Sequence, residues 1–253
     1  MTPDWLVAGS DGNTVQKRSG DYGDSALDLA YPTYFHLLAD AHRRLRPKRY
    51  LEIGVNEGHS LRLGGPETRI VGVDPAPQVW DLNHSNWEII SATSAEFFRR
   101  SDVTKLLGGP VDLAFVDGLH HFEVALADVL SVERYAHAST VVLLHDVLPI
   151  DAITSERKRT TAIWSGDVWK VVVLLRHHRP DLSVSTLDVG PTGMAVITGF
   201  GQLEETLPDQ SWVQAGVEGL LTSSYEDLCA MGIDETLAVV AGTPRSLAGC
   251  IDS

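Results

Sequence analysis

The sequence has few cysteines, few basic residues and no long apolar run. Its two cysteines, Cys229 and Cys250, are too few for the disulfide framework of a small secreted domain, so we expect a reducing, cytoplasmic compartment. No apolar run approaches the ~18 residues that a membrane span needs. The first residues, Met1-Thr2-Pro3-Asp4, lack the basic and apolar regions of a signal peptide. We therefore expect no membrane partner.

Basic residues are scarce relative to acidic ones. The chain has 20 Lys and Arg against 34 Asp and Glu, which gives a formal net charge of −14. Binding of nucleic acid needs a basic face that neutralises phosphates, so the composition excludes a non-specific nucleic-acid partner. With 43% hydrophobic residues among 253, the chain can bury a large core. We expect a small molecule as partner, and the sequence is also compatible with a homo-oligomer.

We divide the chain into three parts. Residues 1–32 are rich in Gly, Ser, Asp and Asn without clean periodicity, and we expect an N-terminal arm or lid there. Residues 33–200 carry the regular patterns of one domain. Residues 201–253 hold nine acidic residues and one arginine, and their Gly and Pro breaks predict an acidic extension of short helices.

Short β-branched apolar runs alternate with helical patterns in the central part. The runs that predict buried parallel strands are 50–55, 69–73, 87–90, 111–116 and 140–144. The helical patterns include 34–41, 94–107, 122–135 and 167–178. Two further runs, 182–187 and 194–198, have a connection so short that only an antiparallel hairpin fits. The sequence predicts an α/β fold with a doubly wound, Rossmann-like seven-stranded sheet, in which five parallel strands precede the hairpin.

The first strand runs into a glycine-containing turn, Glu52-Ile53-Gly54-Val55-Asn56-Glu57-Gly58-His59-Ser60. Gly54 allows a tight turn, and Gly58 lets the backbone approach a ligand. Asp74 follows twenty residues after Gly54, at the end of the second strand. A carboxylate there can accept hydrogen bonds from both hydroxyls of a ribose. The pattern predicts a cofactor that contains a nucleoside.

These residues resemble the class I S-adenosylmethionine-dependent methyltransferases. Glu52-x-Gly54-x-x-x-Gly58 looks like their motif I, Asp74 matches their ribose-binding acid, and the terminal hairpin fits their sheet. Asn56 stands where the usual motif has its middle glycine. The resemblance spans residues 34–199 and implies S-adenosylmethionine as cofactor. It implies cofactor contacts from Glu52, Gly54, Asn56, Gly58, Ser60, Asp74, Thr93, Ser94 and Asp117.

Two of these implied contacts have structural alternatives. Glu52 can serve as an anchor of the motif I loop instead of touching the cofactor. Thr93 can be a helix N-cap, because Glu96 stands three residues later as in a capping box.

Acidic and imidazole side chains follow the fourth and fifth strands. Asp117 and His120 follow the fourth, and His145 and Asp146 the fifth. Adjacent parallel strands lie ~4.8 Å apart, so Asp117 and Asp146 should emerge side by side. Two such carboxylates repel one another unless they are protonated, hydrogen-bonded or bridged by a cation.

This cluster is similar to that of the metal-dependent macrolide-sugar O-methyltransferases of the macrocin and mycinamicin type, and of the cephalosporin-hydroxylase-like group. The resemblance implies that Asp117, His145 and Asp146 bind a divalent metal such as Mg²⁺ or Mn²⁺. It implies Asp117 and His120 as catalytic residues, with His120 as general base. His145 stands where the best-studied members of that group have an acidic residue, and an imidazole ligand favours softer divalent ions. The alternative is that Asp146 caps the next segment and His145 packs against the sheet.

The segment 149–166 is expected over the strand edge, where a substrate would dock. Its Arg157-Lys158-Arg159 run either is a solvated turn or meets a substrate phosphate, and Trp164 can stack on a ring. By the geometry of the family, Tyr22, Tyr31 and His36 would line the opposite wall.

We therefore predict a methyltransferase that acts on a hydroxyl of a small molecule, such as a sugar or a glycosylated natural product. The alternatives are a nicotinamide-dependent oxidoreductase and a non-catalytic domain of the same fold.

Overall fold

The computed structural model describes residues 6–8, 14–16, 29–80, 84–201 and 210–252. Within the N-terminal part, β1 (Leu6–Ala8) and β2 (Thr14–Gln16) pair in antiparallel fashion as a sheet of their own. Most of the expected arm or lid, including Tyr22, lies outside the described residues. No helix among the described residues is long and apolar enough to cross a membrane.

The main sheet has eight strands in the order β10-β8-β9-β7-β6-β3-β4-β5. Its strands are β3 (Arg49–Ile53), β4 (Arg69–Asp74), β5 (Trp87–Ser91), β6 (Leu113–Val116), β7 (Val141–His145), β8 (Ser183–Asp188), β9 (Met194–Thr198) and β10 (Val239–Ala241). Only β9 runs against the others, between β7 and β8. The five parallel strands and the antiparallel hairpin predicted from the sequence are confirmed.

The predicted count of seven strands is wrong. The eighth, β10, pairs in parallel with β8, with Val239 opposite Thr186 and Ala241 opposite Asp188. Three residues between short helices carry too little periodicity to predict a strand, and only the exposed edge of β8 makes this segment extended. The C-terminal extension therefore belongs in part to the sheet.

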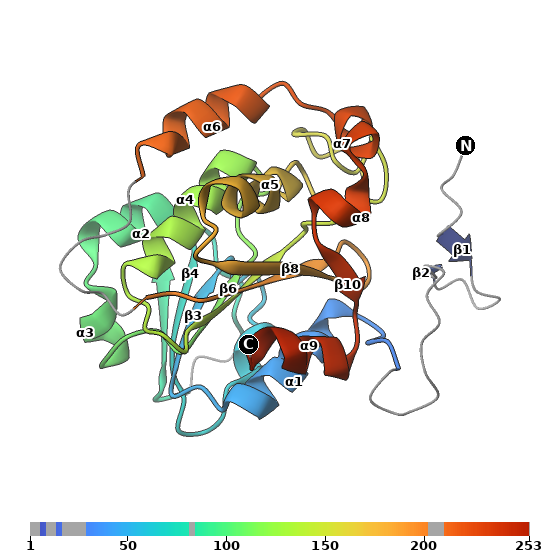
Figure 1. The fold of residues 1–253 in the computed structure, drawn as a ribbon. Helices are drawn as coiled ribbons and strands as arrows, with labels where there is room; N and C mark the ends of the chain where they lie inside the picture. The colour runs from blue at the N-terminus through green and yellow to red at the C-terminus, as the bar shows by residue number, and fades with distance from the viewer. Residues whose placement is uncertain (1–5, 9–13, 17–28, 81–83, 202–209, 253) are drawn as a thin grey trace.

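Helices cover both faces of the sheet (Figure 1). One face carries α1 (Tyr34–Leu45) and α9 (Pro244–Ile251), which contact one another. The opposite face carries α2 (Ser94–Arg100), α4 (Phe122–Glu133), α5 (Trp169–His178) and α6 (Trp212–Leu220). Shorter helices are α3 (Val103–Leu107), α7 (Tyr225–Met231) and α8 (Ile233–Thr236). This three-layer arrangement is the expected doubly wound fold.

Each face of the sheet buries its own apolar cluster. Leu37 and Leu38 of α1 pack with Tyr50 and Ile70 on one side. Phe122 and Trp169 belong to the larger cluster under α4 and α5, and both are fully buried. Burial of such side chains, each worth roughly 1.5–3 kcal/mol, holds the layers together and keeps the strand ends in place.

The expected helix over residues 94–107 is divided in two. Its second part, α3, starts at a new N-cap, Asp102, whose Oδ1 accepts a hydrogen bond from the backbone N–H of Lys105 at 3.1 Å. An Asp at this position satisfies a free N–H and favours a helix start over a helix interior. The crossover between β3 and β4 contains only the short 3₁₀ helix η2 (Ser60–Leu63).

Candidate active site

The carboxyl ends of the central strands meet at one edge of the sheet, beside a cavity of about 890 Å³. Nine of the residues expected at the site line this cavity: Gly54, Asn56, Asp74, Thr93, Ser94, Asp117, His120, His145 and Asp146. Its volume lies in the range of small-molecule pockets, about 300–1,000 Å³. The order of the parallel strands brings these residues together, from positions as far apart in the sequence as Gly54 and Asp146.

Gly54 is required where β3 turns into the cavity. Its φ is +90°, and a Cβ at this position would lie 2.0 Å from the carbonyl oxygen of Asp117. Any other residue would collide with the backbone of the neighbouring strand end. The glycine thus sets how closely the first turn of the fold approaches Asp117.

Asp74 is held by the backbone at the end of β4. Its Oδ2 accepts a hydrogen bond from the N–H of Asn56 at 2.9 Å, and its Oδ1 accepts one from Ala76 at 2.7 Å. Asn56 has a φ of +46°, a left-handed conformation that asparagine tolerates better than most residues. A carboxylate oxygen has two lone pairs, so each oxygen of Asp74 can still accept a further donor from the cavity.

Glu52 and Ser60 lie behind the cavity and are not among its lining residues. The carboxylate of Glu52 is fully buried and accepts hydrogen bonds from the hydroxyls of Tyr50 at 2.6 Å and Ser60 at 2.5 Å. Burial raises the pKa of Glu52 to about 8. These contacts favour the reading of Glu52 as an anchor of the turn. Gly58 also lies outside the lining.

Thr93 combines the two roles considered for it. Its Oγ1 accepts a hydrogen bond from the N–H of Glu96 at 3.3 Å, while the Glu96 carboxylate reaches back to the Thr93 N–H at 3.4 Å. This is the predicted capping box of α2. Thr93 and Ser94 nevertheless line the cavity, so the capped helix start forms one wall of it.

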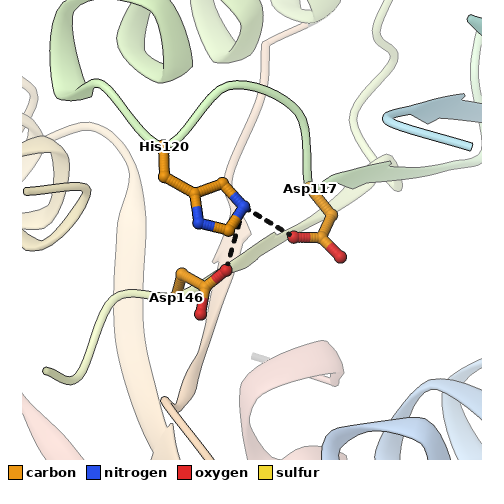
Figure 2. Close-up of side chains that lie close together, drawn as sticks. All are labelled: Asp117, His120 and Asp146. Carbon is orange, nitrogen blue, oxygen red and sulfur yellow. Dashed lines mark ion pairs between the residues drawn. The ribbon is translucent and has the colours of Figure 1, made fainter. Parts of the chain in front are cut away.

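Asp117, His120 and Asp146 converge on one point (Figure 2). Nε2 of His120 lies 3.2 Å from Oδ2 of Asp146 and 3.5 Å from Oδ1 of Asp117. The two carboxylates emerge side by side from β6 and β7, as the pairing of these strands predicts. One ligand atom from each of the three side chains lies within 4.8 Å of the other two.

His145 contacts the same carboxylates. Its Nδ1 lies 3.1 Å from Oδ1 of Asp117 and 3.2 Å from Oδ2 of Asp146. The ring of Tyr34 packs on its imidazole, with centroids 4.1 Å apart. Burial alone would lower the pKa of His145, but the charges of Asp146 and Asp117 raise it to about 10. His145 therefore neutralises part of the negative charge of the pair.

The charges of the cluster are mutually dependent. Burial alone would raise the pKa of Asp117, but the charge of His145 and the hydrogen bond from His120 hold it well below its usual value. Burial likewise opposes the charged form of His120, while Asp117 and Asp146 raise its pKa above the ordinary value. The carboxylate of Asp117 is thus ionised and attracts positive charge, either protons on imidazole or a cation.

Two further contacts fix this geometry. Nδ1 of His120 lies 2.9 Å from the carbonyl oxygen of Trp164, whose indole stacks on the imidazole with centroids 4.8 Å apart. Because a carbonyl can only accept, Nδ1 carries the proton and Nε2 is directed at the carboxylates. The hydroxyl of Thr192 donates to Oδ1 of Asp146, which has an uncommon positive φ of +64°.

The donor set fits a divalent metal ion. Two carboxylates and an imidazole suit Mn²⁺, Fe²⁺ or Zn²⁺, and the carboxylates also suit Mg²⁺. A metal-binding histidine ordinarily donates its other N–H to a carbonyl or carboxylate, as His120 does to Trp164. The reading in which Asp146 merely caps the next segment does not account for this convergence.

Several lining residues were not expected from the sequence: Tyr34, Gly118, Leu119, Ala162, Ile163 and Pro191. The expected wall of Tyr31 and His36 is wrong, because Tyr31 donates to Asp40 at 2.6 Å and His36 contacts Thr33 at 2.9 Å, and neither lines the cavity. Tyr34 takes that place. Trp164 and Arg159 line the cavity, as the expected position of segment 149–166 over the edge implies.

Comparisons with known proteins agree with this geometry. Residues 51–147 match a family model described as a methyltransferase domain. No curated protein matches the chain. The structure of cofactor-bound Rv0187 from MTB is 21% identical, with 72% of this chain and 84% of that chain covered and a TM-score of 0.50. An O-methyltransferase from Bacillus cereus in complex with SAH is 17% identical, with 68% and 83% covered and a TM-score of 0.51.

At these identities the two structures establish a common fold, and the family model matches residues 51–147 as a methyltransferase domain. The matched segment runs from β3 to just past Asp146, so it contains the glycine turn, Asp74 and the Asp/His cluster. Residues 51–147 thus match a methyltransferase domain, in agreement with the resemblance found in the sequence.

Proposed function

We propose that this protein is an S-adenosylmethionine-dependent O-methyltransferase that acts on a hydroxyl of a small molecule with the help of a divalent metal ion. The observation that carries the proposal is the convergence of Asp117, His120 and Asp146 within 4.8 Å, in a cavity that Gly54, Asn56 and Asp74 also line. The family match speaks against the nicotinamide-dependent alternative, and the intact cluster speaks against a non-catalytic domain.

Asp74, Thr93 and Ser94 form the nucleoside side of the proposed cofactor site. The free lone pairs of Asp74 can accept from the ribose hydroxyls, and the start of α2 forms the wall next to it. The Bacillus cereus O-methyltransferase of the same fold was crystallised with SAH. Glu52, Gly58 and Ser60 support this site by holding the turn, without lining it.

Methyl transfer to a hydroxyl is an in-line displacement. The bond from methyl carbon to sulfonium sulfur breaks as the bond to the acceptor oxygen forms, which leaves S-adenosylhomocysteine and releases the hydroxyl proton. Such a reaction mainly needs alignment of two bound reactants and a deprotonated acceptor. A divalent ion supplies the second requirement when bound, because it lowers the pKa of a coordinated hydroxyl.

We assign Asp117, Asp146 and Nε2 of His120 as metal ligands, with Nδ1 of His145 as an additional donor. The role of His120 as general base, expected from the sequence, would use the same Nε2. One nitrogen cannot do both at once, and its direction between the carboxylates supports ligation. The proton of the acceptor then passes to solvent at the mouth of the cavity.

Aromatic side chains support a ring-shaped acceptor. Tyr34 and Trp164 line the cavity next to the cluster, and both place aromatic rings against its imidazoles. Aromatic rings stack well on other rings and on the apolar faces of sugars. A sugar or a glycosylated natural product therefore stays our proposed acceptor class. Residues 33–200 form the proposed catalytic unit.

The proposal is tested by methyl transfer from labelled S-adenosylmethionine to a panel of hydroxylated metabolites, with Mg²⁺, Mn²⁺ or a chelator. We expect label in the acceptor only when a divalent ion is present, and none with Asp146→Asn. Full activity after exhaustive chelation would remove the metal from the scheme. Binding of NAD but not of S-adenosylhomocysteine would overturn the assigned activity.

A further inference from the structure

The cavity is lined by three carboxylates and by two imidazoles that contact two of them. Asp74, Asp117 and Asp146 contribute carboxylates, and each has the partners described above. Arg159 is the one Lys or Arg among the lining residues of the described part of the chain. A permanent positive charge is unexpected in a cavity whose carboxylates suit a metal ion and a sulfonium. The partner of the Arg159 guanidinium is therefore informative about the ligand.

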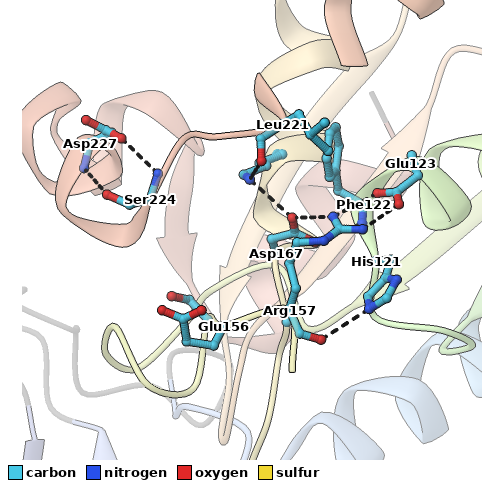
Figure 3. Close-up of polar contacts among 12 residues, drawn as sticks. His121, Phe122, Glu123, Glu156, Arg157, Asp167, Leu221, Ser224 and Asp227 are labelled. Atoms are coloured by element: carbon cyan, nitrogen blue, oxygen red, sulfur yellow. Dashed lines mark hydrogen bonds and ion pairs between the residues drawn. The ribbon is translucent and has the colours of Figure 1, made fainter. Parts of the chain in front are cut away.

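The loop of residues 151–166 that carries Arg159 is firmly anchored (Figure 3). Arg157 binds Glu123 of α4 at 2.5 Å and Asp167 at 2.8 Å. Its carbonyl oxygen lies 3.1 Å from Nε2 of His121, next to the metal-site histidine. Gly166 also packs against the backbone of His120, where a Cβ would lie 2.0 Å from its carbonyl oxygen. The loop is therefore a fixed wall of the cavity.

Arg159 differs from Arg157 in its partners. Its Nε donates to the carbonyl of Thr161 at 3.4 Å and its Nη2 to that of Ala162 at 3.0 Å. No carboxylate lies within ion-pair distance of it among the residues that the structure describes. These two contacts orient the guanidinium and use two of its five N–H groups, which leaves donors for a ligand. A guanidinium stays charged at all physiological pH values and matches carboxylate or phosphate geometry.

We propose that Arg159 binds an anionic group, a carboxylate or a phosphate, on the methyl acceptor and so determines its specificity. This inference rests on the proposed function. The acceptor would be a hydroxylated ring that carries an acid, with its hydroxyl at the Asp117 and Asp146 end and its acid at Arg159. Leu119 and Ile163, apolar residues that are 52% and 44% exposed, line the same cavity and suit the ring.

The chain offers a matched control for Arg159→Gln. Lys158 is exposed, stands in the same loop and carries the same charge, but does not line the cavity. Lys158→Gln therefore removes an equal long-range attraction for anions without removing a contact. A difference between the two variants reports a direct interaction.

The experiment is calorimetric titration of the protein loaded with S-adenosylhomocysteine and Mn²⁺. Two matched probe sets separate the anion from the ring: D-glucose, D-glucuronate and D-glucose 6-phosphate, and 3,4-dihydroxybenzamide with 3,4-dihydroxybenzoate. We expect an anionic member of at least one set to bind about tenfold more tightly than its neutral partner. Arg159→Gln should abolish this preference, and Lys158→Gln should keep it. The sugar set distinguishes a carboxylate from a phosphate.

Three results would overturn the inference. The first is that no anionic probe binds better than its neutral partner. The second is an equal loss of preference in Lys158→Gln. The third is a weaker affinity of Arg159→Gln for S-adenosylhomocysteine itself, which would assign the guanidinium to the carboxylate of the cofactor. If methyl transfer occurs but no anionic probe is preferred, the proposed function stands and the role of Arg159 is disproved. If an anionic probe is preferred but no methyl transfer occurs, the proposed function alone is disproved.

Discussion

The backbone carbonyl of Trp164 accepts the Nδ1 proton of His120 at 2.9 Å, while the indole of the same residue stacks on the imidazole. One loop residue thus sets the tautomer of the histidine and covers one face of its ring. Residues 151–166 therefore support the proposed metal site, although none of its three assigned ligands comes from them.

Replacement of Trp164 separates these two contacts. Trp164→Ala keeps the carbonyl but removes the stacked ring, so we expect about tenfold weaker binding of Mn²⁺, the scale of a lost outer contact at a metal site. Trp164→Phe should retain most of the affinity because an aromatic face remains. Calorimetric titration with Mn²⁺ measures the affinities of both variants. Unchanged affinity in the alanine variant would show that the stack does not support the site.

Replacement of His120 distinguishes a metal ligand from a general base. If its Nε2 binds the ion, His120→Ala should raise the Kd for Mn²⁺ at least tenfold, and saturating Mn²⁺ should restore much of the activity. A general base would instead give an unchanged Kd and turnover reduced ~10²–10⁴-fold at every metal concentration. We expect the first pattern. His59→Ala, an exposed histidine outside the cavity lining, serves as control.

Asp74 is predicted to bind the ribose of the cofactor. Asp74→Ala should weaken S-adenosylmethionine binding by roughly 1.5–3 kcal/mol, the scale of hydrogen bonds to a charged group. Part of this loss comes from the N–H groups of Asn56 and Ala76, which lose their acceptor. Asp74→Asn keeps one acceptor oxygen and should lose less. Calorimetric affinities that do not change in either variant would disprove the ribose contact.

Gly54 should tolerate no side chain. In Gly54→Ala the new Cβ would collide with the carbonyl of Asp117, and we expect a loss of more than about 3 kcal/mol in unfolding free energy, or no folded protein. Gly108→Ala is the matched control, because Gly108 also has a positive φ, of +75°, but has open space around it. It should cost only about 1 kcal/mol. Similar losses in denaturant titrations of the two variants would refute the steric argument.

Asp128 should make stability fall as pH rises. Burial on α4 raises its pKa to about 7, above the ordinary value of 3.8. The folded state therefore holds this proton more tightly than the unfolded state, so the stabilisation is complete below about pH 4 and is lost as pH rises through 7. Asp128→Asn removes this loss, and its stability relative to the unmodified protein should grow by roughly 3 kcal/mol between pH 4 and 8.

Urea denaturation at several pH values measures this difference. Glu226→Gln, which changes an exposed acid, should follow the pH profile of the unmodified protein. Parallel profiles for Asp128→Asn and the unmodified protein would contradict a raised pKa.

The convergence of Asp117 and Asp146 was predictable because it depends on only two facts. Both residues follow apolar strand patterns, and those strands are neighbours in a parallel sheet. The turn at Gly54 and the acid at Asp74 were predictable for the same reason. Strand ends are fixed by the sheet, so residues at those ends keep their relation whatever the loops do.

Contacts made by loops, and contacts that depend on the direction in which a helical side chain points, could not be predicted in this way. Trp164 reaches His120 through residues 151–166, which have no regular period that could place them. Tyr34 instead of Tyr31 or His36 faces His145 because α1 starts at Tyr34, and a shift of a few residues along a helix changes the direction of a side chain. Glu52, for which a cofactor contact and an anchoring role were both open, is fully buried and hydrogen-bonded to Tyr50 and Ser60, which favours the anchoring role.

The position of β10 at the outer edge of the sheet bears on how the chain folds during its synthesis. A ribosome-bound chain that ends near residue 200 already contains the five central strands and the hairpin, yet the backbone groups of β8 that β10 will engage are unpaired. Until residues 239–241 emerge, this edge can pair with any extended segment nearby. Premature stop codons between residues 200 and 239 would therefore yield aggregation-prone, chaperone-dependent products, even though the proposed cofactor and metal residues are all present.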